Sequence, residues 1–534
     1  MARTRKRPRP SLALTLAPVA THCPDCHHRL WTHYTNYRTI TTLGGVTRFT
    51  LPIRRCPNAA CPRFQLPYRP EAEAHFALPH HEFGLDVLGL VGRLRYAEHR
   101  SVPEIHQELT RWGVTLAVRT VTNLLDRYDE LRALATADPK RLGPLLQQQR
   151  RVVLALDGLQ PDVGHEVLWV LRDCLSGEIL LARSLLSATT DDLSALLVEV
   201  RDALPVPITG VVSDGQTSIR KAVTQTLPGV PHQLCHFHYL REAARPIAEA
   251  DRHAKKELKK RVRGIRTLER AAEKEDDVEA ELVRGYCAAV RSALTDDGRP
   301  PLAASGLKLE ERLTAIAASL DRVHAQVGNL PGSLRKLRQL LQRGLEETAA
   351  LWPPVRAAFR WVKRVARLLE NQAALPEDKV RQRLGRILTQ IRQAAAAATT
   401  PVREQLGHFV KVTQSYRSGL FWCYASADLP RTNNDLEHLF GSHKYHERRA
   451  SGRRRAAPGL VVTGAVRVVA GLATRLRPEA NLELPPNYVG EWRRVRGELD
   501  QRREARRQQC RFRRDPATYL TKLEELLVQL SLPS

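Results

Sequence analysis

Hydrophobic and polar residues change their spacing several times along the chain, and each change marks a different kind of predicted element. Residues 21 to about 75 alternate in the manner of short strands, as the stretch from Val46 to Leu51 shows. Residues 82–135 carry apolar side chains at helical spacing, and from residue 151 onward short apolar runs of strand length follow. Residues 240–420 return to helical spacing almost throughout. The pattern predicts a multidomain α+β protein with a long all-helical stretch.

The strand-like segment has a definite order of elements. The apolar run 152–156 leads directly to Asp157, and the run 208–213 leads to Asp214. Between them the pattern predicts two strands joined by a hairpin turn, then a helix over 191–203, and a further helix follows Asp214. Strand, strand, strand, helix, strand, helix is the order of a ribonuclease-H-like α/β core, in which the first and fourth strands lie side by side. Both aspartates can then face one metal site.

The net charge is more informative about the function than the composition is. Hydrophobic residues make up 43% and charged residues 26%, which is ordinary for a globular chain and excludes wholesale disorder and fibrous classes. Lys and Arg number 84 against 57 Asp and Glu, so the net charge is +27 and the pI is near 10.2. Such an excess indicates a polyanionic partner, most often nucleic acid, although acidic proteins and membrane surfaces are alternatives.

The sequence gives no sign of a membrane partner. No run reaches the roughly 18 uninterrupted apolar residues of a membrane span, and the nearest, Gly459 to Ala473, is broken by Arg467. Residues 1–20 are basic and then mildly apolar, like a weak secretory signal, but Pro18 interrupts the apolar part. We interpret them as a disordered basic arm. Nine cysteines are too few for a disulfide scaffold, so we expect a reducing, cytoplasmic location.

Four of the nine cysteines lie near the N-terminus in two close pairs. Cys23 and Cys26 are separated by two residues, and Cys56 and Cys61 by four, a spacing that can hold a tetrahedral Zn²⁺ with four thiolates. A small β-rich segment has little core of its own, so a structural metal would stabilise it. The alternatives are coincidental cysteines, or replacement of one thiolate by a nearby histidine: His22, His27 or His28.

The next segment has the pattern of a helix-turn-helix. A capping box that begins at Ser101 predicts a helix to about Arg111, Gly113 marks the turn, and a second helix is expected from Ala117 to Tyr128. The second helix would enter the major groove of DNA, although two ordinary packed helices would give the same pattern. Three polar residues lie near one face of it and are the expected DNA contacts: Thr120, Asn123 and Arg127.

A third acidic residue, Glu437, opens another helical stretch. Thr432 can cap this helix, and Asn433 and Asn434 lie four and three residues before Glu437, on its face. Asp435 is the rival acid, but it lies roughly 160° from Glu437 around the helix. With Asp157 and Asp214, Glu437 would complete three carboxylates that bridge two divalent cations about 3.5–4 Å apart, a task that suits Mg²⁺.

Two segments concentrate the positive charge. His443 to Arg455 holds six Lys and Arg against one Glu, and Ser451-Gly452 make it flexible, so we expect a loop that holds the DNA backbone. Its basic residues are Lys444, Arg448, Arg449, Arg453, Arg454 and Arg455. Residues 491–514 carry ten Arg against four acids, which fits either a DNA-binding helix or a solvated basic tail.

These motifs together carry a resemblance to a known family. Asp157-Gly158, Val212-Ser213-Asp214-Gly215, Cys235-His-Phe-His238 and Thr432-Asn-Asn-Asp-Leu-Glu437 resemble the DDE transposases of bacterial insertion sequences and Mutator-like elements. The resemblance covers about residues 150–475. It implies that Asp157, Asp214 and Glu437 bind the catalytic Mg²⁺ ions. Cys235 and His238, with Asn433 and Asn434, would support the site. Cys235 and His238 would help to order it or bind metal, and the alternative is a buried cysteine and a hydrogen-bonded histidine.

The resemblance implies an activity and partners. Such an enzyme cleaves double-stranded DNA at the element ends with water, and the 3′-hydroxyl then attacks target DNA. It needs no nucleotide cofactor. It would act as a homo-oligomer, because paired ends must be brought together, and it would be nucleoid-associated. The alternatives are a transposase-derived DNA-binding protein without catalysis and a metal-dependent nuclease that cuts without strand transfer.

The predicted organisation has seven segments. In chain order they are a basic arm (1–20), a zinc ribbon (21–80), a helix-turn-helix (81–140), the first part of the catalytic core (150–240), a helical insertion (241–425), the second part of the core with Glu437 (426–478), and a basic helical tail (485–534).

Overall fold

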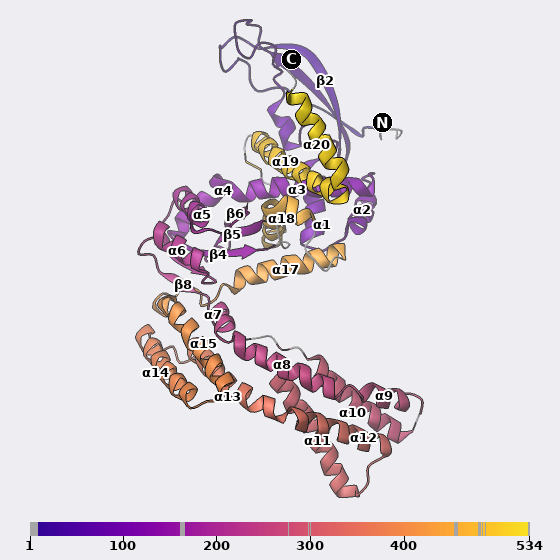
Figure 1. Ribbon diagram of the computed structural model, residues 1–534. Coiled ribbons are helices and arrows are strands. Elements are labelled where there is room, and N and C mark those ends of the chain that lie inside the picture. The colour runs from indigo at the N-terminus through magenta and orange to yellow at the C-terminus, as the bar shows by residue number, and fades with distance from the viewer. Residues whose placement is uncertain are drawn as a thin grey trace. The chain divides into compact units, whose positions relative to one another are not determined.

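The computed structural model of the chain describes residues 9–160, 166–275, 277–296, 298, 301–452, 458–478, 482, 484, 485 and 488–531 (Figure 1). It divides into two compact units. The first unit joins Met1–Ile208 with Asp435–Ser534, and the second is Thr209–Asn434. The fold is of mixed α+β class, mostly helical, with two small sheets.

The first sheet lies at the start of the first unit. Its strands are β1 (Leu12–Thr15), β2 (Trp31–Thr42) and β3 (Gly45–Arg55), in the order β1-β3-β2. The alternation predicted around Val46 to Leu51 is confirmed, because Phe49 and Leu51 are buried while Arg48 faces solvent. β1 pairs in parallel with β3. Part of the segment interpreted as a disordered arm is therefore a strand, because β3 offers an edge to which it can hydrogen-bond.

Helices α1 to α4 follow the first sheet. They are α1 (Leu85–Tyr96), α2 (Val102–Arg111), α3 (Val118–Ala137) and α4 (Pro139–Gln149). Leucine and valine side chains of α1, α2 and α3 share one buried cluster, which also includes Trp492. The third helix runs well beyond its predicted end at Tyr128, because its apolar spacing continues past Leu131 into the packed interior.

The second sheet has five strands in the order β6-β5-β4-β7-β8. They are β4 (Val152–Leu159), β5 (Val167–Asp173), β6 (Ile179–Leu185), β7 (Ile208–Ser213) and β8 (His232–Leu234). β4, β5 and β6 pair antiparallel, and β7 pairs in parallel with β8. Helices α5 (Thr190–Ala203) and α6 (Thr217–Thr226) precede and follow β7. The elements follow the chain order that the sequence predicted.

The second unit is otherwise helical, as the spacing over 240–420 predicted. Its α-helices are α7 (His236–Ala243), α8 (Arg245–Arg261), α9 (Ile265–Ala272), α10 (Val278–Thr295), α11 (Ser305–Val327), α12 (Gly332–Thr348), α13 (Trp352–Glu370), α14 (Glu377–Ala396), α15 (Thr400–Tyr416) and α16 (Trp422–Ala425). They bury two separate apolar clusters, one around Phe409 and one around Leu337. The helices of the second unit therefore pack as two bundles, each with its own core.

Helices α17 to α20 complete the first unit. They are α17 (Asn434–Ser451), α18 (Pro458–Leu476), α19 (Tyr488–Arg514) and α20 (Pro516–Ser531). The sequence predicted a basic loop from His443, but the described part of that segment is helical as far as Ser451. His443 and His446 are buried at helical spacing, and this packing keeps the helix intact. No helix among the described residues combines the length and apolar character that a membrane span requires.

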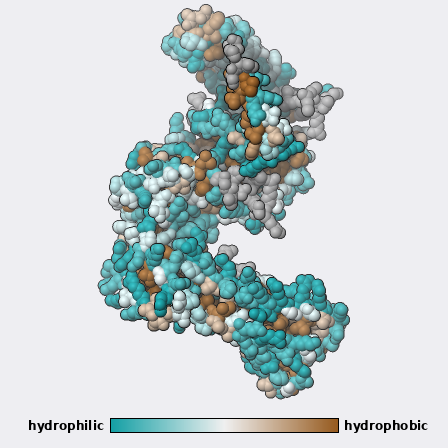
Figure 2. Space-filling view, in the orientation of Figure 1, coloured by the Kyte–Doolittle hydropathy of each residue, from teal (hydrophilic) through white to brown (hydrophobic). Residues whose placement is uncertain are grey.

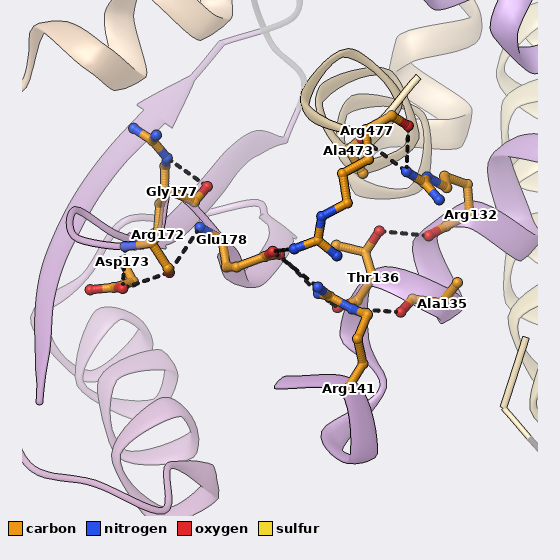
Figure 3. A network of polar contacts seen from close by, with 11 residues as sticks. Arg132, Ala135, Thr136, Arg141, Arg172, Asp173, Gly177, Glu178, Ala473 and Arg477 are labelled. Carbon is orange, nitrogen blue, oxygen red and sulfur yellow. Dashed lines mark hydrogen bonds and ion pairs between the residues drawn. The ribbon is translucent and has the colours of Figure 1, made fainter. Parts of the chain in front are cut away.

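The buried carboxylate of Glu178 connects several of these elements through arginine side chains (Figure 3). Glu178, just before β6, accepts two hydrogen bonds from the Arg141 guanidinium of α4, at 2.9 and 3.0 Å. Arg477, directly after α18, pairs with the same carboxylate. Arg132 of α3 donates to the carbonyl oxygens of Ala473 and Arg477, at 3.0 Å each. Bidentate and shared arginine contacts of this kind fix geometry, so α3, α4 and α18 are held against the β5–β6 hairpin.

Candidate active site and zinc site

The four predicted cysteines come together into one cluster, which confirms that prediction. Their sulfur atoms all lie within 4.8 Å of one another. The Sγ atoms of Cys23 and Cys61 are 3.7 Å apart, and those of Cys26 and Cys56 are 3.4 Å apart. A tetrahedral Zn²⁺ with bonds of about 2.3 Å would separate its sulfur ligands by about 3.8 Å. The arrangement therefore fits a structural zinc ion.

The turn around the first cysteine pair explains the geometry. The Cys23 amide donates to the carbonyl of His28 at 2.9 Å, and the His27 amide donates to the carbonyl of Cys23 at 3.0 Å. Hydrogen bonding by the backbone at His28 lowers the pKa of Cys26 to about 6, whereas burial raises the pKa of Cys56. In the absence of a metal, the thiolate is therefore favoured at Cys26 and not at Cys56. The three neighbouring histidines lie outside the cluster and are exposed, so four thiols form the site: His22, His27 and His28 are not needed.

Asp157 lies inside β4, because the strand continues two residues further, to Leu159. Its side chain is buried, with 9% of its surface exposed, and Oδ1 accepts a hydrogen bond from the Gly158 amide at 2.8 Å. Every other residue of β4 except Gly158 is also buried, as expected of a strand covered on both faces. A carboxylate in this setting is fixed in place by the sheet.

Asp214 directly follows β7 and is half-buried. Its Oδ1 accepts a hydrogen bond from the Gln216 amide at 2.9 Å, and the Tyr416 hydroxyl donates to its carbonyl oxygen at 3.2 Å. Gly215 has a φ of +86°, and a Cβ there would lie 2.5 Å from Cε1 of Tyr416. This position therefore requires glycine, both for its backbone and for the close approach of the tyrosine ring.

Tyr416 is a neighbour of the site that the sequence reasoning missed. It ends α15, and burial is the main cause of its raised pKa, with the Asp214 carboxylate as a further cause. Arg220 of α6 donates to the carbonyl and hydroxyl oxygens of Ser415, at 2.8 and 3.2 Å. The end of α15 is thus hydrogen-bonded both to the backbone of Asp214 and to α6. A tyrosine far away in sequence carries no local signal of this role.

Cys235 links the Cys-x-x-His element to the segment before Glu437. It is fully buried, and its Sγ accepts a hydrogen bond from the Asn433 amide at 3.3 Å. The His236 amide donates to the carbonyl of Arg431 at 3.0 Å. Asn433 is itself buried, whereas Asn434 and His238 are half-buried. Burial and this hydrogen bond fit both an ordinary buried cysteine and one that orders the site, so the supporting role of Cys235 stays a prediction.

Glu437 lies in the first turn of α17 and is half-buried. The rival acid Asp435 points elsewhere: its side chain is 80% exposed and pairs with Arg172 at 3.7 Å. Lys444 and Arg448 lie 7 and 11 residues after Glu437, within about 20° of its direction around the helix, and both are exposed. Arg449 is also exposed. The predicted contacts Arg453, Arg454 and Arg455 lie outside the described residues.

The three predicted acids belong to different units of the chain. Asp157 and Glu437 lie in the first unit, and Asp214 lies in the second. Among the residues that the structure describes, the four cysteines are the one group of three or more ligating side chains close enough to hold a metal. The role of Asp157, Asp214 and Glu437 as a metal-binding triad therefore stays a prediction.

The predicted capping box of the helix-turn-helix is confirmed. The Ser101 amide donates to Glu104 Oε2 at 2.7 Å, and the Glu104 amide donates to Ser101 Oγ at 3.5 Å. Gly113 makes the turn with a φ of +77°. In the second helix Asn123 is exposed and Thr120 half-buried, so both can reach a ligand.

Arg127, the third predicted DNA contact, is corrected by the structure. It is buried, and its Nη1 lies 2.8 Å from Oε2 of the fully buried Glu130. Arg496 and Trp492 of α19 donate to the same carboxylate, at 3.0 and 2.8 Å. A guanidinium held inside the protein does not contact DNA. The exposed polar residues on the first turns of α3 are instead Arg119, Thr122 and Asn123.

The buried face of α17 contacts a network of buried charged residues in the first unit. Tyr96 donates to Asp129 at 2.6 Å, and Arg467 of α18 lies 3.8 Å from Asp129 and 3.6 Å from Glu447. Arg95 lies 3.6 Å from the same Glu447. Burial raises the pKa of Asp129 to about 7. These contacts join α1, α3, α17 and α18, so they fix the rotation of the helix that carries Glu437.

Comparison with known proteins identifies one region. No curated protein sequence matches the chain. Residues 196–299 match the model of the family described as transposase, Mutator family. The matched residues include Asp214, Cys235 and His238, whereas Asp157, Glu437 and the cysteine cluster lie outside them. The resemblance stated from the sequence is thereby confirmed for this region, and residues 196–299 carry a transposase domain of the Mutator family.

Proposed function

We propose that this transposase is an active DDE-type enzyme that cleaves the ends of a mobile element and joins them to target DNA. Asp157, Asp214 and Glu437 would hold two Mg²⁺ ions. The observation that carries the proposal is the position of Asp214, which lies within the Mutator-family match and directly after a buried strand. Asp157 belongs to another strand of the same sheet.

The chemistry of the three side chains fits the metal. Carboxylate oxygens are the ligands that Mg²⁺ prefers, and three of them leave positions for water and phosphate oxygens. When bound, the ions would supply an activated water or 3′-hydroxyl and a stabilised leaving oxygen. The chain's own residues would position these groups. The Gln216 amide orients the Asp214 carboxylate, and the Asn433 amide is held by Cys235 just before the Glu437 helix.

Lys444 and Arg448 would bind the DNA backbone next to Glu437. They continue the direction of Glu437 along α17 and are exposed. Two cations in line with a metal-binding carboxylate can hold successive phosphates of a strand that enters the site. Arg449 would add a third phosphate contact from the neighbouring side of the helix.

The N-terminal part would recognise double-stranded DNA. We propose that α3 reads the major groove through Thr120 and Asn123, joined by Arg119 and Thr122, and that the zinc ribbon adds contacts beside it. The chain would act as a homo-oligomer on two element ends. It would work in the cytoplasm, associated with the nucleoid.

The test is cleavage and joining of DNA that carries the native element ends, with Mg²⁺. We expect Asp157→Asn, Asp214→Asn and Glu437→Gln each to lower both steps by at least about 10³-fold while DNA binding persists, because each removes one charged metal ligand. Asp435→Asn is the matched control and should retain activity. A wild type that binds the ends but cuts with neither Mg²⁺ nor Mn²⁺ would establish the DNA-binding alternative. Cutting without joining would indicate a nuclease.

A further inference from the structure

The last helix of the described chain, α20, exposes apolar side chains along its whole length. The exposed fraction is 47% for Leu520 and Leu523, 66% for Leu527 and 85% for Leu530. Leu526 and Val528 are 49% and 61% exposed. Figure 2 shows this hydrophobic surface along α20. α20 packs against α19, and Phe512 of α19 meets Tyr519 edge to face at a ring separation of 5.7 Å.

Four of the exposed leucines form one stripe. Leu520, Leu523, Leu527 and Leu530 follow spacings of three, four and three residues, which places them on a single side of the helix. The opposite side is polar, with Thr521, Lys522, Glu525 and Gln529. A helix of 16 residues is marginal by itself in water, and a stripe of this length is typical of a surface that packs against another helix.

We propose that α20 packs antiparallel against α20 of a second copy of this chain. The stripe is symmetric about residue 525. Two copies that run in opposite directions therefore place Leu523 beside the partner's Leu527, and Leu520 beside the partner's Leu530. A two-fold interface requires such self-complementarity, because the same patch must serve both copies. The proposal rests on the proposed function in one respect, namely that joining two element ends requires at least two copies.

The charges of the two helices favour a second copy. Residues 516–531 carry one Lys and two Glu, so α20 does not share the chain's positive excess and two such helices repel little. Antiparallel packing brings the basic end of the partner's α19 beside the C-terminal end of α20. Arg513 and Arg514 of that end are exposed, and the C-terminus of a helix carries partial negative charge. A membrane surface is disfavoured, because helices that lie on anionic lipid carry a basic polar face.

Sedimentation of the full chain without DNA or metal tests the proposal. We expect the wild type at twice the chain mass of 60.2 kDa. Leu523→Glu with Leu527→Glu should weaken dimerisation at least 100-fold and give the single-chain mass. Thr521→Glu with Gln529→Glu, on the polar side of the same helix, is the matched control and should leave the dimer intact. Unchanged helical circular dichroism of both variants would show that the chain still folds.

Mixing two weakened variants tests the antiparallel geometry. A Leu523→Glu chain and a Leu527→Lys chain should each dimerise poorly alone. Together they should form a heterodimer, because antiparallel packing pairs the new Glu with the new Lys in one layer and keeps two leucines in the other. Absence of this rescue would overturn the antiparallel arrangement, and a monomeric wild type or a dimeric Leu523→Glu/Leu527→Glu variant would overturn the interface.

Failure of the α20 interface can be distinguished from failure of the proposed function, because sedimentation requires no catalysis. A dimer that never cuts element ends would refute the enzyme and leave the α20 interface standing. A monomer that cuts and joins them would do the reverse.

Discussion

Tyr416 and Arg127 show what individual residues reveal only in three dimensions. The ring of Tyr416 lies against Gly215, and its hydroxyl contacts the backbone of Asp214, although the two positions are far apart in sequence. Arg127 lies on the helix that was expected to read DNA, but its guanidinium is paired with buried Glu130. A single sequence predicts which helix face a residue shares, but it does not predict which face another element will cover.

The cysteine cluster was predictable at the same scale, for a physical reason. Zinc ligands come in short pairs because each pair must be presented by one tight turn, so the spacing of Cys23 and Cys26 is itself a structural constraint. Aspartates at strand ends carry a weaker signal. Asp-Gly pairs also form ordinary turns, and nothing local to Asp157 or Asp214 brings a third carboxylate to them.

Asp129 gives a prediction for pH dependence. Burial raises its pKa from 3.8 to about 7, so between these values the folded chain holds a proton that the unfolded chain has released. Stability from this group is present below about pH 4 and is lost as the pH rises to about 7. Asp129→Asn should therefore gain stability relative to wild type over this window, by up to about 4 kcal/mol.

Urea unfolding of both proteins at several pH values measures this difference. Buried His443 and His446, whose pKa values burial lowers to about 4 and about 2, act in the opposite direction, but they are present in both proteins and cancel. A difference that does not change between pH 4 and 8 would contradict the raised pKa of Asp129.

At the scale of elements, α17 shows where sequence patterns mislead. Ser451, Gly452 and a dense run of basic residues favoured a loop, yet the helix continues to Ser451 because His443, His446 and Glu447 are buried beneath it. The strands and the helices of residues 240–420 were predictable, because apolar spacing directly reflects which faces are buried. The rotation of α17 depends on Arg95 and Arg467 from other helices, which no local pattern contains.

The exposed residues Lys444 and Arg448 of α17 predict that DNA binding depends on salt concentration. Lys444→Ala with Arg448→Ala should weaken binding to all DNA sequences alike and reduce the slope of log affinity against log salt by about 2, or about 1 for each phosphate that is no longer neutralised. Fluorescence anisotropy at several salt concentrations measures the slope. Arg383→Ala with Arg386→Ala removes the same charge from exposed positions of α14 and serves as control. Equal slopes for the two double variants would exclude a phosphate-binding role for α17.

At the scale of the whole molecule, the chain has several separate cores, and the cysteines of the candidate zinc site form a small cluster of their own with Leu30. The helices of the second unit pack around Phe409 and Leu337. Local loss of structure in one part need not unfold the rest. Several cores were expected from the length of the chain, but their boundaries were not, because β7 and α17 begin at the borders between units.

Removal of zinc should therefore act locally. Chelation should release one Zn²⁺ per chain and weaken DNA binding, while most helical circular dichroism remains. Cys56→Ser should fail to retain zinc, and Cys510→Ser, at an exposed position of α19, should retain it. Zinc analysis of the purified proteins checks this prediction. A chain that holds no zinc, or that loses most of its helicity on chelation, would contradict it.

The contact between Cys235 and Asn433 has a consequence for how this protein can vary. The chain leaves the neighbourhood of β8 at His236, passes through the helices α7 to α16, and returns to the thiol of Cys235 at Asn433. Closing a flexible loop costs free energy that rises only with the logarithm of its length. The two ends of residues 236–433 are held together by this contact, so the length of the chain between them can change at little cost in free energy. The bundles of this segment could be shortened, extended or exchanged while the entry and exit points remain the same.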